Sequence, residues 1–172
     1  SGVVTGTGER GVSASANYGG VTLDVNEANG GVGIYANTFG GDEGISITSD
    51  TANGVNFGIE ARNYGTGDTT ITTTGIATAT SGTGIYSYTA YGTRDSSITT
   101  AGAFGNNNGI NARHYGDGPL NITATGSVTG QTSNGIAAST GLDGSGVVIA
   151  ATDVTGGNQG ISVNHTGFGA LA

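Results

Sequence analysis

The hydrophobic positions of the chain recur in a short phrase, Gly followed by Ile or Val, that returns at a nearly constant interval. The seven phrases begin at Gly11, Gly33, Gly58, Gly84, Gly109, Gly135 and Gly160. The interval is about 25 residues, and a period in this range is typical of a repeat architecture, in which each repeat packs on its neighbours.

Each phrase opens a segment in which small and mixed side chains alternate. The residue two positions after the aliphatic one is small in each repeat, whereas the residues on either side of it vary and are mostly polar. A period of two predicts a strand with one buried face. We therefore expect one buried column of Ile59, Ile85, Ile110 and Ile136, and a second of Ala61, Ala112 and Ala138.

Two further strands are predicted in each repeat. A second strand is centred on Ile71, Ile98, Ile122 and Ile149, and a weaker third one contains Ile76, Ala103, Val128 and Val154. The Thr, Ile and Val residues around these positions suit strands. Asn-Gly dipeptides at 29–30, 53–54, 108–109 and 134–135 are expected to turn the chain with positive φ, which Asn and Gly tolerate.

Three short strands and three turns per repeat predict one coil of an all-β fold, a right-handed parallel β-helix (β-solenoid) of about seven coils. We expect a single domain over residues 1–172 with a repeat region at 11–165. An irregular β-sandwich and a disordered chain are the alternatives. Because the repeat is still present near Gly160, the chain is expected either to be cut from a longer solenoid or to stack end to end into fibres.

The charge of the chain excludes some partners. The four basic residues are all Arg, the acids number 12, and the net charge is −8. Nucleic acid and anionic lipid both require clustered Lys and Arg. No stretch approaches the roughly 18 apolar residues of a membrane span, so we expect no membrane insertion by this segment. Any export signal is expected to have been removed or to lie outside this sequence.

The repeat resembles the β-helical passenger domains of bacterial autotransporters. The phrases that carry the resemblance are Gly-Ile-Tyr-Ser-Tyr at 84–88, Ala-Arg-Asn-Tyr-Gly at 61–65 and Ile-Thr-Thr-Thr-Gly at 71–75, and it covers about residues 11–165. The resemblance implies a secreted protein or one on the bacterial cell surface, with a role in adhesion, aggregation or binding to a host receptor. The lack of Cys fits the family.

Tyr and Arg in the outward positions of the first strand are the predicted partner-binding residues. These side chains are favoured in protein interfaces, and flat aromatic rows also suit stacking on sugars. Ordinary cross-strand packing of Tyr is the alternative explanation. The five residues are Tyr35, Arg62, Tyr86, Tyr88 and Arg113.

Acidic residues recur before the second strand, at Asp42, Asp68, Asp95, Asp117 and Asp143. Such a ladder could bind Ca²⁺, but local hydrogen bonds in turns explain it as well. His114 and His165 are expected in one column two coils apart, too far for a shared metal ion, and are interpreted as solvated surface residues. We predict no metal site and no cofactor.

Glu60 and Arg62 are expected to pair on the surface of one strand, a contact of small energy. A polysaccharide-cleaving enzyme would need converging carboxylates, which the spread of the acids does not provide, so no enzyme is predicted. The outward Thr70, Thr72, Thr74, Thr99, Thr123 and Thr125 leave an ice-binding solenoid as the alternative function. The leading interpretation is a structural or adhesive solenoid that presents a sheet face to a protein receptor, a glycan or copies of itself.

Overall fold

The computed structural model describes residues 3–6 and 8–172, and these residues form strands, bends and turns without a helix. No helix that is long and apolar enough to cross a membrane is therefore found among them. The strands are β1 (Val3–Thr5), β2 (Arg10–Ala16), β3 (Val21–Thr38), β4 (Ile45–Asn63), β5 (Thr69–Ala79), β6 (Thr83–Thr89), β7 (Ser96–Gly105), β8 (Ile110–His114), β9 (Pro119–Gly130), β10 (Asn134–Thr140), β11 (Gly146–Gly156), β12 (Gln159–His165) and β13 (Ala170–Leu171).

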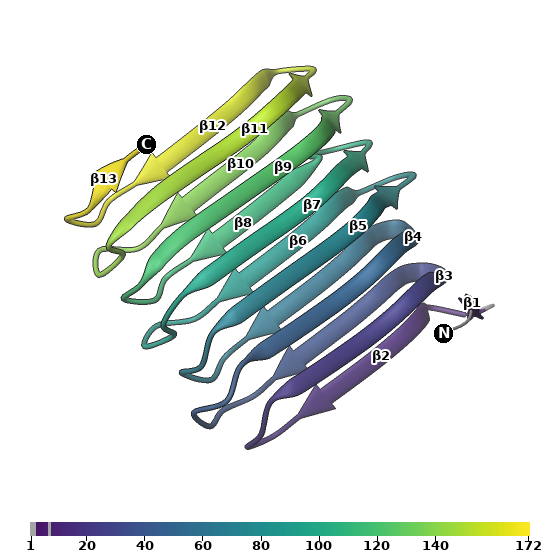
Figure 1. Ribbon diagram of the computed structural model, residues 1–172, viewed down its shortest axis with the longest axis horizontal. Coiled ribbons are helices and arrows are strands. Elements are labelled where there is room, and N and C mark those ends of the chain that lie inside the picture. The colour runs from purple at the N-terminus through teal and green to yellow at the C-terminus, as the bar shows by residue number, and fades with distance from the viewer. Residues whose placement is uncertain (1–2, 7) are drawn as a thin grey trace.

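The strands stack as a parallel β-solenoid of about seven coils, which confirms the predicted fold class (Figure 1). In each coil the chain passes along one wall of stacked strands, turns, and passes back along a second wall. Wall A consists of β2, β6, β8, β10, β12 and the second halves of β3 and β4, and wall B consists of β5, β7, β9, β11, β13 and the first halves of β3 and β4. Every strand pair is parallel, because each strand bonds to the equivalent strand of the next coil.

The core is a set of aliphatic columns that runs along the solenoid axis. In wall A, Ile34, Ile59, Ile85, Ile110 and Ile136 follow one another in register and are fully buried. In wall B, Ile47, Ile71, Ile98 and Ile122 form the facing column, and all belong to one continuous cluster. The predicted Ala61, Ala112 and Ala138 are buried beside the first column, with Ser87 between them. Small side chains there let the two walls approach.

The predicted division into three separate strands per coil is wrong. The second and third predicted strands form one strand in wall B, with a shift in register near its middle, as between Thr73 and Ile76 of β5. Across this irregularity β5 has one residue more than β7, and the alternation of buried residues continues unchanged in β5 but shifts by one position in β7. Ile76, which was predicted to share a strand column with Ala103, therefore pairs with Gly102 and is exposed, and the buried Ala77 lies opposite Ala103.

The predicted positive φ at the Asn-Gly dipeptides is also wrong. In the described residues, positive φ occurs only at Gly41, Gly92 and Gly146, which lie in or next to the longer turns from wall A to wall B. Gly30 and Gly54 instead lie inside β3 and β4. Neither has a positive φ, and a Cβ atom would clash with the backbone of Gly11 at Gly30 and with that of Phe57 at Gly54, so these glycines are needed for space.

A column of polar residues, all buried except the half-buried His165, closes the C-terminal edge of wall A. It alternates between Thr and a residue that has two polar atoms, in the order Thr38, Asn63, Thr89, His114, Thr140 and His165. The side-chain oxygen of Thr38 lies 2.7 Å from Asn63 Oδ1, that of Thr89 lies 2.5 Å from His114 Nδ1, and that of Thr140 lies 2.6 Å from His165 Nδ1.

In each pair, the other polar atom of the Asn or His side chain binds a backbone carbonyl in the following turn. Asn63 Nδ2 donates to the Gly67 carbonyl at 2.8 Å, and the Nε2 atoms of His114 and His165 lie 2.9 Å from the carbonyls of Gly118 and Gly169. The prediction of a solvated His114 is therefore wrong, because its side chain is completely buried. The histidines do lie in one column, with Thr140 between them.

These pairs reveal that the structural repeat contains two coils. Thr38, Thr89 and Thr140 are 51 residues apart, and so are Asn63, His114 and His165. The hydrogen bond runs within each pair of coils, from the Thr coil to the Asn or His coil. The interval between successive Gly-Ile phrases is thus half of a more regular period of 51.

Candidate binding face

The outer surface of wall A carries two columns of side chains in register. One contains Tyr35, Glu60, Tyr86, Asn111, Ala137 and Ser162, and the other contains Asn37, Arg62, Tyr88, Arg113, Ser139 and Asn164. All five predicted partner-binding residues lie in these columns. Arg62, Tyr86, Tyr88 and Arg113 come from three successive coils and so form one group, while Tyr35 is separated from Tyr86 by Glu60.

Glu60 and Arg62 form the only ion pair among the described residues. Both the Nε and the second guanidinium nitrogen of Arg62 lie 2.6 Å from Glu60 Oε1. The pairing is as predicted, but it is less exposed than expected, since the Glu60 side chain is only 8% accessible. Burial opposes the charge on Arg62, but hydrogen bonding with Glu60 and Tyr64 and the Glu60 charge outweigh it, so the pKa of Arg62 lies above its ordinary value. Arg62 therefore stays charged.

Aromatic rings fix the neighbouring side chains. The Arg62 guanidinium lies over the Tyr86 ring at 5.5 Å from its centroid, and Phe57 packs on the same ring at a centroid distance of 5.5 Å. Arg10 lies over Tyr35 at 3.6 Å. These contacts hold the rings and guanidinium groups in place, and side chains that are already held lose little entropy in an interface.

Four tyrosines form a second aromatic group at the C-terminal edge of wall A. The ring centroids are 5.3 Å apart for Tyr64 and Tyr88, 5.8 Å for Tyr88 and Tyr115, and 5.7 Å for Tyr91 and Tyr115. Tyr64 and Tyr91 remain 42% and 69% exposed. Burial and the neighbouring tyrosines, chiefly Tyr64 and Tyr115, raise the pKa of Tyr88, so its hydroxyl keeps its proton and can donate a hydrogen bond. We call Tyr64, Tyr88, Tyr91 and Tyr115 the tyrosine cluster.

Sequence reasoning identified Tyr88 but not the other three members of this cluster. Tyr64, Tyr91 and Tyr115 lie in the turns after β4, β6 and β8, where no strand alternation marks them. The 51-residue period was the missing signal, because the phrase Ala-Arg-Xaa-Tyr-Gly occurs at 61–65 and again at 112–116. Arg62 and Tyr64 are thereby matched by Arg113 and Tyr115 two coils away.

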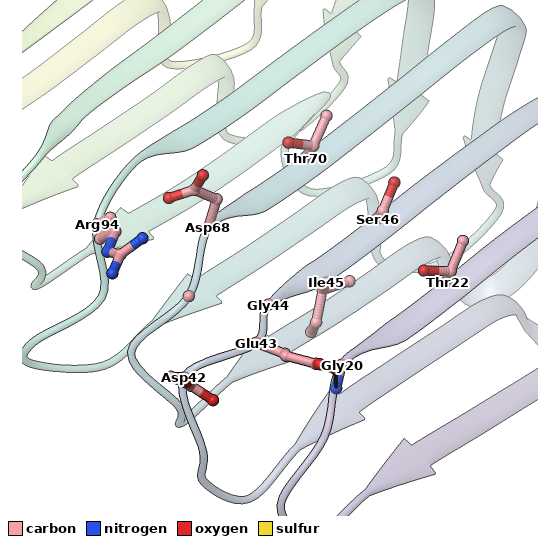
Figure 2. Close-up of a pocket in the computed structure, with 11 residues that line it drawn as sticks. Gly20, Thr22, Asp42, Glu43, Gly44, Ile45, Ser46, Asp68, Thr70 and Arg94 are labelled. Carbon is pink, nitrogen blue, oxygen red and sulfur yellow. Dashed lines mark hydrogen bonds between the residues drawn. The ribbon is translucent and has the colours of Figure 1, made fainter.

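The aspartate ladder lies in the longer turns and does not converge on one point. Figure 2 shows Asp42, Asp68 and Arg94 on successive turns, with the side chains of Asp42 and Asp68 pointing apart. Asp68 Oδ1 accepts a hydrogen bond from the Asp95 backbone N–H at 3.1 Å, and Glu43 accepts one from the Gly20 N–H at 2.7 Å. Within residues 3–6 and 8–172, no group of three or more His, Cys, Asp and Glu side chains could hold a metal ion.

The outer surface of wall B carries the rows of Thr. Thr48, Thr72, Thr99 and Thr123 are in register over four successive coils, and the row ends with Asp24 on one side and Ala150 on the other. The neighbouring row is mixed, with Thr22, Ser46, Thr70, Ser97 and Asn121. The first three residues of this mixed row are visible side by side in Figure 2.

No protein-family profile matches the chain, and searches of curated proteins and of solved structures found no significant similarity.

Proposed function

We propose that this chain is an adhesive β-solenoid that binds a partner through the outer surface of wall A. The observation that supports the proposal is the tyrosine cluster, in which exposed rings are braced by one another next to Arg62 and Arg113. Tyr and Arg contribute most of the binding energy in many interfaces, and rigid aromatic anchors lose little entropy when they bind. Wall A supplies a flat and continuous sheet on which such anchors keep their spacing.

The proposal places the chain on the bacterial cell surface or in the secreted fraction, in the manner of autotransporter passenger domains. The resemblance of the repeats supports this location, and the parallel solenoid is compatible with it. The role is one of binding, without a catalytic step. Copies of the chain are a further candidate partner, because the last described coil exposes Ile161, Val163 and Leu171 around an apolar hollow of about 310 Å³.

Adhesion of coated beads tests the proposal. Beads that carry the purified chain should bind cultured epithelial cells, and the double substitution Tyr91→Ala/Arg113→Ala should weaken that binding about tenfold or more, as expected when interface anchors are removed. Both side chains are exposed, so the fold should be unaffected, which circular dichroism would check. The control is Thr72→Val/Thr123→Val on wall B, which should bind as the original chain does. Equal binding by the Tyr91/Arg113 variant and the original chain would contradict the proposal.

The Thr row of wall B favours a second candidate function, binding to ice. Four successive threonines in register make a flat, regular array of hydroxyl and methyl groups. Measurement of thermal hysteresis separates the two functions. If wall B binds ice, the chain will depress the freezing point and the Thr72/Thr123 variant will lose this activity, while the Tyr91/Arg113 variant keeps it.

A further inference from the structure

A groove runs along the outer surface of wall A, beside the tight turns that lead from wall B. It consists of three hollows of about 450, 550 and 290 Å³. Neighbouring hollows share lining residues, Val32 and Asn56 in one case and Asn108 and Asn111 in the other, so the three are continuous. Because adjacent strands are about 4.8 Å apart, a groove over these coils is on the order of 25 Å long.

The central hollow is lined by aromatic rings and by amides. Phe57 and Tyr86 supply the rings, which are tilted by 46° to each other. Asn56 and Asn107, which occupy equivalent positions two coils apart, are both exposed at this hollow. An aromatic surface flanked by groups that both donate and accept hydrogen bonds suits a ligand with apolar faces and many hydroxyls.

Glu60 adds an acceptor to the same hollow. Its Oε1 atom takes both bonds from Arg62, and Oε2 has no hydrogen bond to any described residue. Glu60 is the only carboxylate among the residues that line this hollow. Cleavage of a glycosidic bond would require a second carboxyl group, so the hollow is suited to binding rather than hydrolysis. Because Oε2 is not among the buried atoms that lack a partner, it is accessible, and a ligand hydroxyl could donate to it.

These features distinguish between classes of ligand. The net charge of −8 and Glu60 disfavour acidic polymers, including nucleic acid and uronic acid glycans. A peptide added as a further strand would need a free strand edge, but the wall A strands beneath the groove are paired on both sides. A neutral sugar chain meets neither obstacle, since sugar rings stack on aromatic side chains and their hydroxyls pair with amides and carboxylates.

We propose that this groove binds a linear, uncharged oligosaccharide that lies along the solenoid axis. This inference rests on the proposed adhesive function and names the chemical class of its partner. A pyranose unit is about as long as one strand spacing, so successive sugars meet successive coils. Tyr86 and Phe57 stack on the sugar rings, and Glu60 and the amides bind the sugar hydroxyls. Because sugars and coils have nearly the same spacing, a longer oligosaccharide contacts more coils and binds more tightly.

Isothermal titration calorimetry with defined oligosaccharides tests the groove. The probes are the neutral hexaoses of β-1,4-glucose, β-1,4-mannose and α-1,4-glucose, each with its disaccharide, and a hyaluronan hexasaccharide as the acidic counterpart. The chain should bind at least one neutral hexaose, about tenfold more tightly than its disaccharide, and should bind hyaluronan more weakly. Tyr86→Ala should reduce the affinity about tenfold or more, and Glu60→Gln, which nearly preserves the shape, should reduce it several-fold.

The matched control is Tyr18→Ala, which removes an exposed tyrosine that lies in the turn after β2, outside both the groove and the tyrosine cluster, and should leave hexaose affinity unchanged. Failure of every neutral hexaose to bind, equal affinity in the Tyr86→Ala variant, or tighter binding of hyaluronan would overturn the inference. Bead adhesion separates this result from the proposed function. Adhesion that depends on Tyr91 and Arg113 without hexaose binding overturns only the glycan groove, while Tyr86-dependent hexaose binding without adhesion overturns only the adhesive role.

Discussion

At the scale of single residues, the buried polar column shows that two different side chains meet one structural requirement. Asn63 and His114 occupy equivalent positions two coils apart, and each pairs with the Thr of the preceding coil and binds a carbonyl in the following turn. An amide and a neutral imidazole both offer one acceptor and one donor at suitable positions. The geometry assigns the His114 Nε2 proton to the Gly118 carbonyl and leaves Nδ1 to accept from Thr89.

This arrangement makes stability depend on pH. Burial lowers the pKa of His114 from its ordinary value, although the Gly118 carbonyl, Asp95 and Asp117 oppose the shift. Because the unfolded chain then takes up the proton more readily, the stability is complete above about pH 6.5 and falls as the pH drops below it, by at most about 1.4 kcal/mol per unit. His114→Asn, which copies the residue found at position 63, should remove this part of the pH dependence.

The measurement is the free energy of unfolding in urea between pH 7.5 and 5.5. At pH 7.5 the His114→Asn variant should lie within about 1 kcal/mol of the original chain, because both hydrogen bonds are preserved. Carboxylates contribute equally to both proteins, so the difference between the two curves isolates His114. Parallel curves over this range would show that the imidazole does not remain neutral in the folded state.

Ala112 tests how tightly the two walls approach. Its side chain is completely buried between Ser87 and Ala138 of the neighbouring coils. Ala112→Leu should overpack the wall and cost about 1–3 kcal/mol in thermal or urea unfolding. Ala137→Leu, on the outward face of the adjacent coil, is the matched control and should cost much less. An unchanged melting curve for Ala112→Leu would mean that the core has room for three more carbon atoms.

At the scale of elements, close packing between coils explains why Gly opens each wall A strand. A Cβ atom on Gly33, Gly58, Gly84, Gly109 or Gly135 would lie 2.6 to 2.8 Å from the carbonyl oxygen of the equivalent glycine in the next coil. Real Cβ atoms essentially never approach an atom so closely. The Gly-Ile phrase is therefore a packing requirement of stacked coils, and it is the reason why the repeat is visible in the sequence.

The last phrase provides a matched comparison. At Gly84 a Cβ would meet three backbone oxygens within 2.9 Å, those of Gly109, Phe104 and Ala77, whereas at Gly160 its nearest neighbour would be the Val154 oxygen at 3.3 Å. Gly84→Ala should cost several kcal/mol, since backbone in two coils must move, and Gly160→Ala should cost less than about 1 kcal/mol. Thermal unfolding of both variants gives the comparison. Equal melting temperatures would show that the coils can separate locally at little cost.

At the scale of the whole molecule, the stacking of coils could be predicted from the sequence and the path within each coil could not. The Gly-Ile phrase and the isoleucine columns specify which strands pair, because a parallel solenoid repeats the same contact in every coil. The irregularity in wall B has no such marker, so the sequence groups Ile76 with Ala103, whereas in the structure Ile76 pairs with Gly102 and Ala77 pairs with Ala103. The outward positions on the wall A strands were predicted correctly. The grouping of Tyr64, Tyr91 and Tyr115 could not be predicted, because these residues lie in turns, where side chains do not alternate.

The 51-residue unit makes a final prediction about the whole solenoid. Leu171 pairs with Val147, which pairs with Leu120, and Leu171 comes 51 residues after Leu120. A copy of residues 121–171 added directly after Leu171 should therefore continue both walls in register. The added coils would cover Ile149, Ile161 and Val163, and full burial of such side chains contributes about 1.5–3 kcal/mol each. The melting temperature measured by circular dichroism should rise by several degrees.

A copy that starts one residue later, 122–171, is the control, because a shift of one residue turns every side chain of a strand to the opposite face. It should give no increase, and an in-register extension that melts no higher than the original chain would show that the two-coil unit does not propagate the fold.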